Sequence, residues 1–315
     1  MEKELYDALQ VRFIKLRFTV AFLQDSQLPK DKVSAIRGGM GEMLLRMNCI
    51  RDRQCKACDF ESECIVQKTM YSKFEKTPNF VTTGGSIGYV LECEDVRGYF
   101  REGETLDFCL ILFGRTIVYL NQFVQAFREM GMQNGIGKSH ARFQIYDIKN
   151  TEGQSVLEKN ILDMRKCIVH VLYDYILFRN MWSNIMGMGS RMVFKSPLTL
   201  KYRNEFLQEF QLDAIVNAVI RRIYMLDCFE GIESDIYKKY NYSDIIVPEF
   251  LQQEHHLVHV CRYSTRKNEK MILKGIKGQA LLSELSEDIW QILIVGELIH
   301  IGKNTSFGFG RYVIQ

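Results

Sequence analysis

Histidine is scarce in this 315-residue chain, which has six of them, and none precedes His140. Neither the His-Glu-x-x-His pattern of zinc proteases nor the Gly-x-Ser-x-Gly turn of serine hydrolases occurs. A clustered acidic set is also missing, so a polymerase or a two-metal nuclease has no support. The sequence therefore argues against several large classes of hydrolase.

Long apolar runs are missing as well. No stretch reaches the roughly 18 apolar residues of a membrane span, and the opening Met-Glu-Lys-Glu-Leu lacks the apolar core of a secretory signal. Nine cysteines without such a signal argue against a disulfide framework. We therefore expect a cytoplasmic protein without a membrane partner.

The hydrophobic periodicity predicts an α+β fold with two domains. Half-buried strands, amphipathic helices and further strands follow one another in the order strand, helix, strand, strand, helix, strand, and this order occurs twice. That order is the ferredoxin-like βαββαβ pattern. The segments of the first copy are 9–23, 33–47, 86–94, 104–113, 117–130 and 141–148, and those of the second are 192–202, 206–228, 256–263, 270–282, 282–293 and 311–314. We place the N-terminal domain at 1–185 and the C-terminal domain at 186–315.

A short glycine-rich motif repeats between the two copies. Gly131-x5-Gly137-Lys138 corresponds to Gly296-x5-Gly302-Lys303, and an Arg-aromatic-x-Ile strand follows each, beginning at Arg142 and Arg311. Dense glycine beside a lysine suits a phosphate-bearing ligand. The nucleotide-hydrolase loop is excluded, because it would follow a strand and open a helix, whereas these loops follow a helix and open a strand.

Four cysteines lie within 16 residues as Cys49-x5-Cys55-x2-Cys58-x5-Cys64. Thiolates at this spacing can hold a structural zinc ion, or an iron–sulfur cluster as the alternative. The remaining interpretation is four unrelated thiols. We predict a small metal-binding insert at residues 48–70, with zinc as the first choice.

Two histidines lie in the glycine-rich loops, His140 in the first and His300 in the second. An imidazole titrates near neutral pH, so either could take part in acid–base chemistry. His255, His256 and His259 fit an exposed strand better than a metal site. A basic cluster at 262–277 and the net charge of +3 are compatible with nucleic acid and also with an ordinary solvated surface.

Several of these motifs together resemble the CRISPR-associated endoribonucleases of the RAMP superfamily that cut precursor CRISPR RNA. The resemblance covers nearly the whole chain and is most specific in its last 55 residues. The motifs that carry it are Arg262-Tyr-Ser-Thr-Arg266, Gly275-x-x-Gly278, Gly296-Glu-Leu-Ile-His-Ile-Gly-Lys303 and Phe307-Gly-Phe-Gly-Arg311, with Ile36-Arg-Gly-Gly39, the four-cysteine insert and Ser196-Pro-Leu-Thr-Leu200.

The resemblance implies tandem ferredoxin-like domains that bind CRISPR repeat RNA and cleave it without a metal through attack of a 2′-hydroxyl. The cleaved RNA would be retained, and other CRISPR effector subunits would be further partners. The residues it implies for catalysis are His300 and Lys303, with Tyr263 as a helper. Those it implies for RNA binding are Arg37, Lys138, His140, Arg142, Arg262, Arg266, Lys274 and Arg311.

The chain departs from this family in its first helix. Many members have a histidine there, whereas Glu42 stands where one is expected in this branch. Three functions therefore stay open: a repeat-specific endoribonuclease, a non-catalytic RAMP subunit that holds guide RNA, and a metal-stabilised interaction module without RNA.

Overall fold

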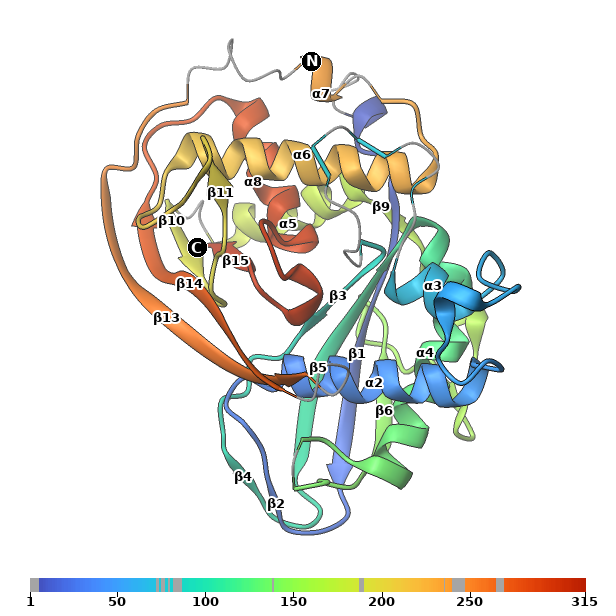
Figure 1. Cartoon of the computed structure of the whole chain (residues 1–315). Coiled ribbons are helices and arrows are strands. Elements are labelled where there is room, and N and C mark those ends of the chain that lie inside the picture. Colours follow the sequence, from blue (N-terminus) through green and yellow to red (C-terminus); the bar gives the residue numbers. More distant parts are fainter. Residues whose placement is uncertain are drawn as a thin grey trace. The chain divides into compact units, whose positions relative to one another are not determined.

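The computed structural model describes residues 6–71, 74, 77–78, 80–81, 87–137, 139–186, 190–234, 236–239, 247–264 and 269–315 (Figure 1). The chain forms two compact units. The first comprises residues 1–12, 170–261 and 270–315, and the second comprises 13–169 and 262–269. Among the described helices, none is both long enough and apolar enough to cross a membrane.

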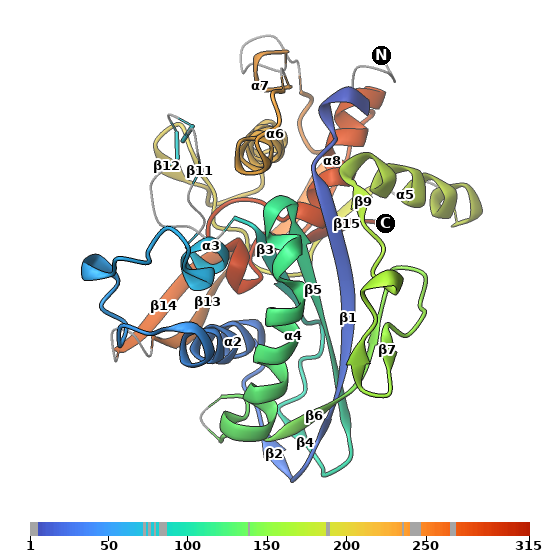
Figure 2. The same ribbon diagram turned by 90° about the vertical axis from the view of Figure 1, so that its right-hand side faces the viewer.

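The second unit has the predicted ferredoxin-like order. Its antiparallel sheet runs β3-β5-β1-β6, and α2 packs against α4 (Figure 2). The six elements are β1 (Arg12–Phe22), α2 (Val33–Asn48), β3 (Tyr89–Glu92), β5 (Thr105–Phe113), α4 (Leu120–Glu129) and β6 (Phe143–Lys149). Around them lie β2 (Ser26–Gln27), η1 (Cys55–Ala57), α3 (Ile65–Met70), β4 (Tyr99–Phe100), η2 (Gly114–Tyr119), η3 (Met130–Asn134), β7 (Leu157–Glu158), β8 (Ile161–Leu162) and η4 (Met164–Lys166).

The alternation read in β1 is confirmed, since Leu16, Phe18 and Val20 are buried in the core of this unit. Gly39 and Gly41 of α2 have a packing role. A Cβ at Gly39 would lie 2.2 Å from the Met130 sulfur, and one at Gly41 would lie 2.8 Å from the Met70 methyl. These glycines therefore let α2 approach its neighbours closely, which offsets part of their cost in a helix.

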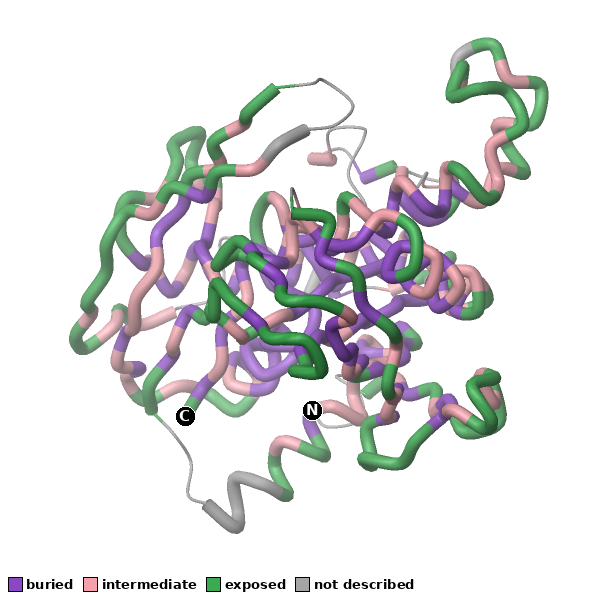
Figure 3. Tube along the Cα trace, turned by 90° about the horizontal axis from the view of Figure 1, so that it is seen from below, coloured by how far each residue is buried: buried purple, intermediate pink, exposed green. Residues whose placement is uncertain are grey.

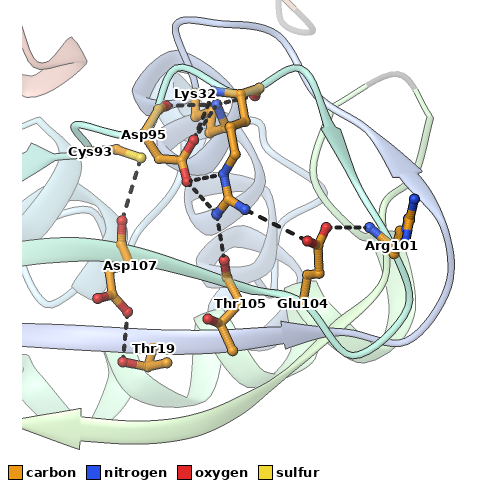
Figure 4. Close-up of polar contacts among 9 residues, drawn as sticks. Thr19, Lys32, Cys93, Asp95, Arg101, Glu104, Thr105 and Asp107 are labelled. Carbon is orange, nitrogen blue, oxygen red and sulfur yellow. Dashed lines mark hydrogen bonds and ion pairs between the residues drawn. The ribbon is translucent and has the colours of Figure 1, made fainter.

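A buried lysine organises the loop between β3 and β4. Lys32 is fully buried, and its ammonium donates to the backbone carbonyls of Asp95 and Arg97, both at 2.7 Å (Figure 4). Burial lowers the pKa of Lys32, against the opposing effect of Cys93 and Asp95. The Asp95 carboxylate in turn accepts from the Arg97 guanidinium at 2.6 Å. The network fixes the entry to α2.

The first unit repeats the same topology. Its antiparallel sheet runs β13-β14-β10-β15, and helices α6 and α8 pack together. Its elements are β9 (His170–Val171), α5 (Leu172–Met186), β10 (Arg191–Phe194), β11 (Lys201–Tyr202), β12 (Glu205–Phe206), α6 (Leu212–Glu230), α7 (Ile236–Lys239), β13 (Gln252–Ser264), β14 (Glu269–Leu281), α8 (Glu287–Ile299), η5 (Thr305–Phe307) and β15 (Tyr312–Ile314). The last residues of β13, from Arg262 to Ser264, and the first residue of β14, Glu269, group with the second unit. Tandem ferredoxin-like folds are thus confirmed.

The helical segment expected at 206–228 is shorter at its beginning. Helix α6 starts at Leu212, and residues 201–206 form the hairpin β11–β12 instead. Arg203 and Asn204 at its tip have φ of 46° and 70°, the conformation of a tight two-residue hairpin turn. Phe206, the first residue of the expected helix, therefore belongs to a hairpin strand.

A buried carboxylate joins three elements of the first unit. Glu297 of α8 accepts from the Arg179 guanidinium at 2.8 Å, from the Tyr175 hydroxyl at 3.0 Å and from the backbone N–H of Ile314 at 2.6 Å. Helix α5 therefore packs with the C-terminal sheet, and the units divide near residue 170, whereas the sequence suggested 185. The buried segments of both units are drawn in purple in Figure 3.

Candidate nucleic-acid interface

The glycine-rich loop, residues 300–311, joins α8 to β15 and is folded upon itself. Ile301 donates its backbone N–H to the Gly310 carbonyl at 3.1 Å. Gly302 has φ of 80°, and a Cβ there would lie 2.5 Å from the Thr199 carbonyl oxygen. Gly310 has φ of 72°, and a Cβ there would lie 1.8 Å from the Ile301 carbonyl oxygen. These glycines serve the packing of the loop itself rather than the approach of a ligand.

Lys303 and Lys274 are brought together through Thr199. The backbone N–H of Lys303 donates to the Thr199 carbonyl at 2.7 Å, and the Thr199 hydroxyl donates to the Lys274 carbonyl. Both lysine side chains are exposed. The structure thus places a residue predicted for catalysis and one predicted for RNA binding on either side of one threonine, where two cations can meet neighbouring phosphates.

His300, predicted as catalytic, is fully buried and has φ of 57°. A side chain without exposure cannot contact a phosphate in this conformation. Its position at the C-terminal end of α8, in a backbone conformation uncommon outside glycine, instead sets the direction of the loop. The side chain of Tyr263, the predicted helper, lies outside the described residues.

Two predicted RNA-binding residues of the second unit influence each other. Burial lowers the pKa of Arg262, and the positive charge of Arg37 lowers it further. The two guanidinium groups are therefore within electrostatic range of each other, which is compatible with a polyanionic ligand. Sequence positions 37 and 262 are far apart, so only the fold reveals this pair.

The remaining predicted RNA-binding residues are dispersed. His140 is exposed, has φ of 51°, and its Nδ1 lies 2.9 Å from the Asn134 carbonyl oxygen. Arg142 is exposed, while Arg311 is half-buried and donates its backbone N–H to the Ser196 hydroxyl at 2.9 Å. Lys138 and Arg266 lie outside the described residues.

Glu42, which stands where a histidine was expected, is held by two arginines. Its Oε1 accepts from Arg46 at 2.9 Å and from Arg53 at 2.6 Å. Burial raises the pKa of Glu42, but the hydrogen bonds from Arg53 and Arg46 outweigh burial and leave it below the usual value. A carboxylate stabilised in this way is a weak base, so Glu42 links α2 to the cysteine segment rather than replacing a catalytic histidine.

The four cysteines of the insert line one cavity of about 370 Å³. Cys49 Sγ accepts the backbone N–H of Arg53 at 3.2 Å, and the Cys58 N–H donates to the Cys55 carbonyl in a turn. No three His, Cys, Asp or Glu side chains of the described segments are close enough together to hold a metal ion. The thiols thus share a cavity without forming a coordination sphere, and the metal stays a prediction.

Sequence comparison assigns both halves of the chain to family models. A model described as an N-terminal domain matches residues 9–170, and the CRISPR-associated endoribonuclease Cas6 model matches residues 192–312. No curated protein matches the chain.

Solved structures share its fold at low sequence identity. A chain of a partial Cas6-RT-Cas1–Cas2 complex is 11% identical with a TM-score of 0.56, and the match covers 98% of this chain and 47% of that one. A chain of the Cas6-RT-Cas1–Cas2 complex is also 11% identical, with a TM-score of 0.56. That match covers 98% of this chain but only 29% of the other one. The Thermus thermophilus Cas6 is 11% identical with a TM-score of 0.50, and the match covers 97% of this chain and 99% of that one.

The two family matches lie in tandem and correspond to the two ferredoxin-like folds described above. The Cas6 match contains the glycine-rich loop with Lys303 and also Lys274. The resemblance seen in the sequence is therefore confirmed, and residues 192–312 match the Cas6 family of CRISPR-associated endoribonucleases.

Proposed function

We propose that the protein is an endoribonuclease that cuts precursor CRISPR RNA within its repeats and retains the product. The observation that carries this proposal is the Cas6 family match over the loop that presents Lys303 to solvent. The exposed Lys274 beside it supplies a second cation for the RNA backbone. A Cas6 product complex shares the fold, which agrees with a protein that holds cleaved RNA.

The proposed reaction needs no metal. The 2′-hydroxyl of the nucleotide before the cut attacks the adjacent phosphate and forms a cyclic phosphate. The bond to the 5′-oxygen breaks, and that oxygen leaves as a hydroxyl after it takes up a proton. A base must accept the 2′-hydroxyl proton, an acid must supply the leaving group, and cations must stabilise the pentavalent phosphate.

Lys303 suits the last of these tasks, because it is an exposed cation on a loop whose backbone is fixed at Thr199. Buried His300 supports Lys303 by holding the start of the loop, so it is a positioning residue in this conformation. Tyr263 remains our proposed helper in proton transfer.

The alternative is a RAMP subunit that binds guide RNA without cutting it. Glu42 favours this function, because it stands where a catalytic histidine is expected. Its ion pairs with Arg46 and Arg53 make it a weak base. The paired guanidinium groups of Arg37 and Arg262 suit either function. Assembly with other CRISPR subunits is proposed from the fold shared with the Cas6-RT-Cas1–Cas2 chains.

One assay separates the two functions. The protein is incubated in EDTA with its repeat RNA and with the same RNA carrying a 2′-deoxy substitution at the scissile nucleotide. Cleavage of the all-ribose RNA alone, with a cyclic phosphate end, supports the nuclease. Binding of both RNAs with cleavage of neither would leave the guide-RNA subunit as the function.

Two variants then test the site. Lys303→Ala should lower the cleavage rate strongly, whereas Lys159→Ala, an exposed lysine of the β7–β8 turn, should not. His300→Ala should weaken cleavage together with the stability of the loop. Full cleavage by His300→Ala with unchanged stability would remove His300 from the site altogether.

We also propose that the four cysteines hold a structural zinc ion, with an iron–sulfur cluster as the alternative. Their shared cavity and the N–H that Arg53 donates to Cys49 Sγ support this proposal, because such bonds stabilise a thiolate. Zinc would contribute to the folding of the insert and take no part in the reaction. Elemental analysis and a visible absorption spectrum distinguish the two metals.

A further inference from the structure

Phe206 is a large aromatic side chain that the fold leaves half exposed beside the proposed RNA site. It lies on β12, and 49% of its surface is exposed. The Lys303 ammonium lies 4.9 Å from the centroid of its ring, within the range of a cation–π contact. The exposed aromatic ring of the hairpin and the exposed cation of the glycine-rich loop thus form one surface.

The hairpin holds Phe206 in place. Phe206 pairs with Lys201 across the two strands, and Leu207 donates its backbone N–H to the Leu200 carbonyl at 3.0 Å to close the base of the hairpin. The Tyr202 hydroxyl donates to the Asp213 carboxylate of α6 at 2.8 Å. The hairpin therefore holds the backbone of Phe206 in place, which limits the entropy lost when the ring binds a ligand.

The charges around the ring select the kind of ligand. Lys201 and Arg203 of the hairpin are exposed, and the Arg203 side chain is 79% exposed. Lys303 lies against the ring and Lys201 is its cross-strand neighbour, so two cations accompany the exposed apolar ring. A single-stranded nucleic acid offers both complements, a chain of phosphates and bases with flat π-faces.

We propose that Phe206 is a stacking platform for one base of single-stranded RNA, at a nucleotide whose phosphate contacts Lys303. This inference rests on the proposed RNA-binding function. It adds Phe206 as a residue that contacts a base rather than the phosphate backbone. Stacking on Phe206 is tolerant of base identity, because every base has a π-face. The platform fixes the position of the strand on the loop rather than selecting a sequence.

Abasic scanning of the RNA tests the contact directly. Affinities are measured for the repeat RNA transcribed from the CRISPR array that accompanies this protein, with each nucleotide in turn replaced by an abasic one. For the unchanged protein, one abasic position should lower the affinity about tenfold. For Phe206→Ala, affinity for the intact RNA should fall about tenfold, and the same abasic position should then have no further effect.

Further variants separate stacking from bulk and charge. Phe206→Trp should preserve both the affinity and the abasic sensitivity, whereas Phe206→Leu should lose the sensitivity. Tyr146→Ala removes a 71% exposed aromatic of β6 and should behave as the unchanged protein. The effect of Phe206→Ala should also be independent of salt, unlike that of Lys303→Ala.

The outcomes are distinguishable. If the unchanged protein binds repeat RNA but Phe206→Ala keeps its affinity and its full abasic profile, the stacking platform is refuted and the RNA function stands. If the unchanged protein binds no RNA, both the function and the platform fail.

Discussion

Asp227 of α6 offers a quantitative test of the C-terminal core. The residue is fully buried, and neither of its carboxylate oxygens has a hydrogen-bond partner at bonding distance among the described residues. Burial raises its pKa from 3.8 to about 7; the nearby Ser234 hydroxyl opposes this shift, and Glu230 adds to it. Between pH 3.8 and about 7, Asp227 is therefore protonated in the folded protein and ionised in the unfolded chain.

The sign of the pH dependence follows. Below pH 3.8 the ionisation of Asp227 does not lower the free energy of unfolding. The loss grows as the pH rises and reaches roughly 4 kcal/mol above pH 7. Asp227→Asn replaces the carboxyl group by an amide of nearly the same volume that does not ionise. The variant should therefore gain stability relative to the unchanged protein as the pH rises, by roughly 3 kcal/mol between pH 5 and pH 8.5.

Urea unfolding at the two pH values measures this gain. Asp7→Asn, which changes an exposed carboxylate of the same unit, serves as the matched control and should show no such trend. If Asp227→Asn differs from the unchanged protein by the same free energy at both pH values, Asp227 does not titrate in this range and the reasoning fails.

Further substitutions test the other sites. Lys303→Ala should reduce the slope of log affinity for repeat RNA against log salt by about one, and an unchanged slope would exclude a phosphate contact. Glu297→Ala should lower the free energy of unfolding by roughly 3–5 kcal/mol in urea, because it leaves the Arg179 guanidinium without its buried partner; a loss below about 1 kcal/mol would contradict this. Lys32→Met should cost on the order of 2–3 kcal/mol in the same assay, since two backbone carbonyls lose their donor, and a neutral result would show that water replaces it. Cys58→Ser should lower the zinc content from about one ion per chain, and a preparation of the unchanged protein without zinc or iron would refute the metal site.

The fold could be predicted because its signals are local. The alternation of Leu16, Phe18 and Val20 and the helical spacing after Val33 are set by which side chains face the core. The hairpin β11–β12 was missed because its turn uses Arg203 and Asn204 at positive φ rather than glycine. Without that turn, the apolar residues after 206 fit a helical period.

The site was predictable in part. The glycine-rich loop and Lys303 follow from a motif in the sequence, but the burial of His300 depends on how the loop folds back upon Pro197–Thr199. Phe206 had no sequence signal, since its neighbour Lys303 is almost a hundred positions away. Of the two partners of Glu42, Arg46 lies four positions along the same helix and is predictable, whereas Arg53 is a tertiary contact that no residue spacing reveals.

Val11 and Arg12 bond to elements of the first unit, and this has a practical consequence. Arg12 donates its backbone N–H to Glu230 at 2.9 Å, and the Glu230 side chain is only 4% exposed. Val11 accepts the backbone N–H of Leu172. A fragment limited to the Cas6 match at 192–312 would lack Arg12, so the buried Glu230 carboxylate would become exposed to solvent. It would also lack Val11 and helix α5, which begins at Leu172. The segments of the two units therefore alternate along the sequence. Each unit can be produced complete only from the intact polypeptide or from a circular permutant in which the original ends are joined.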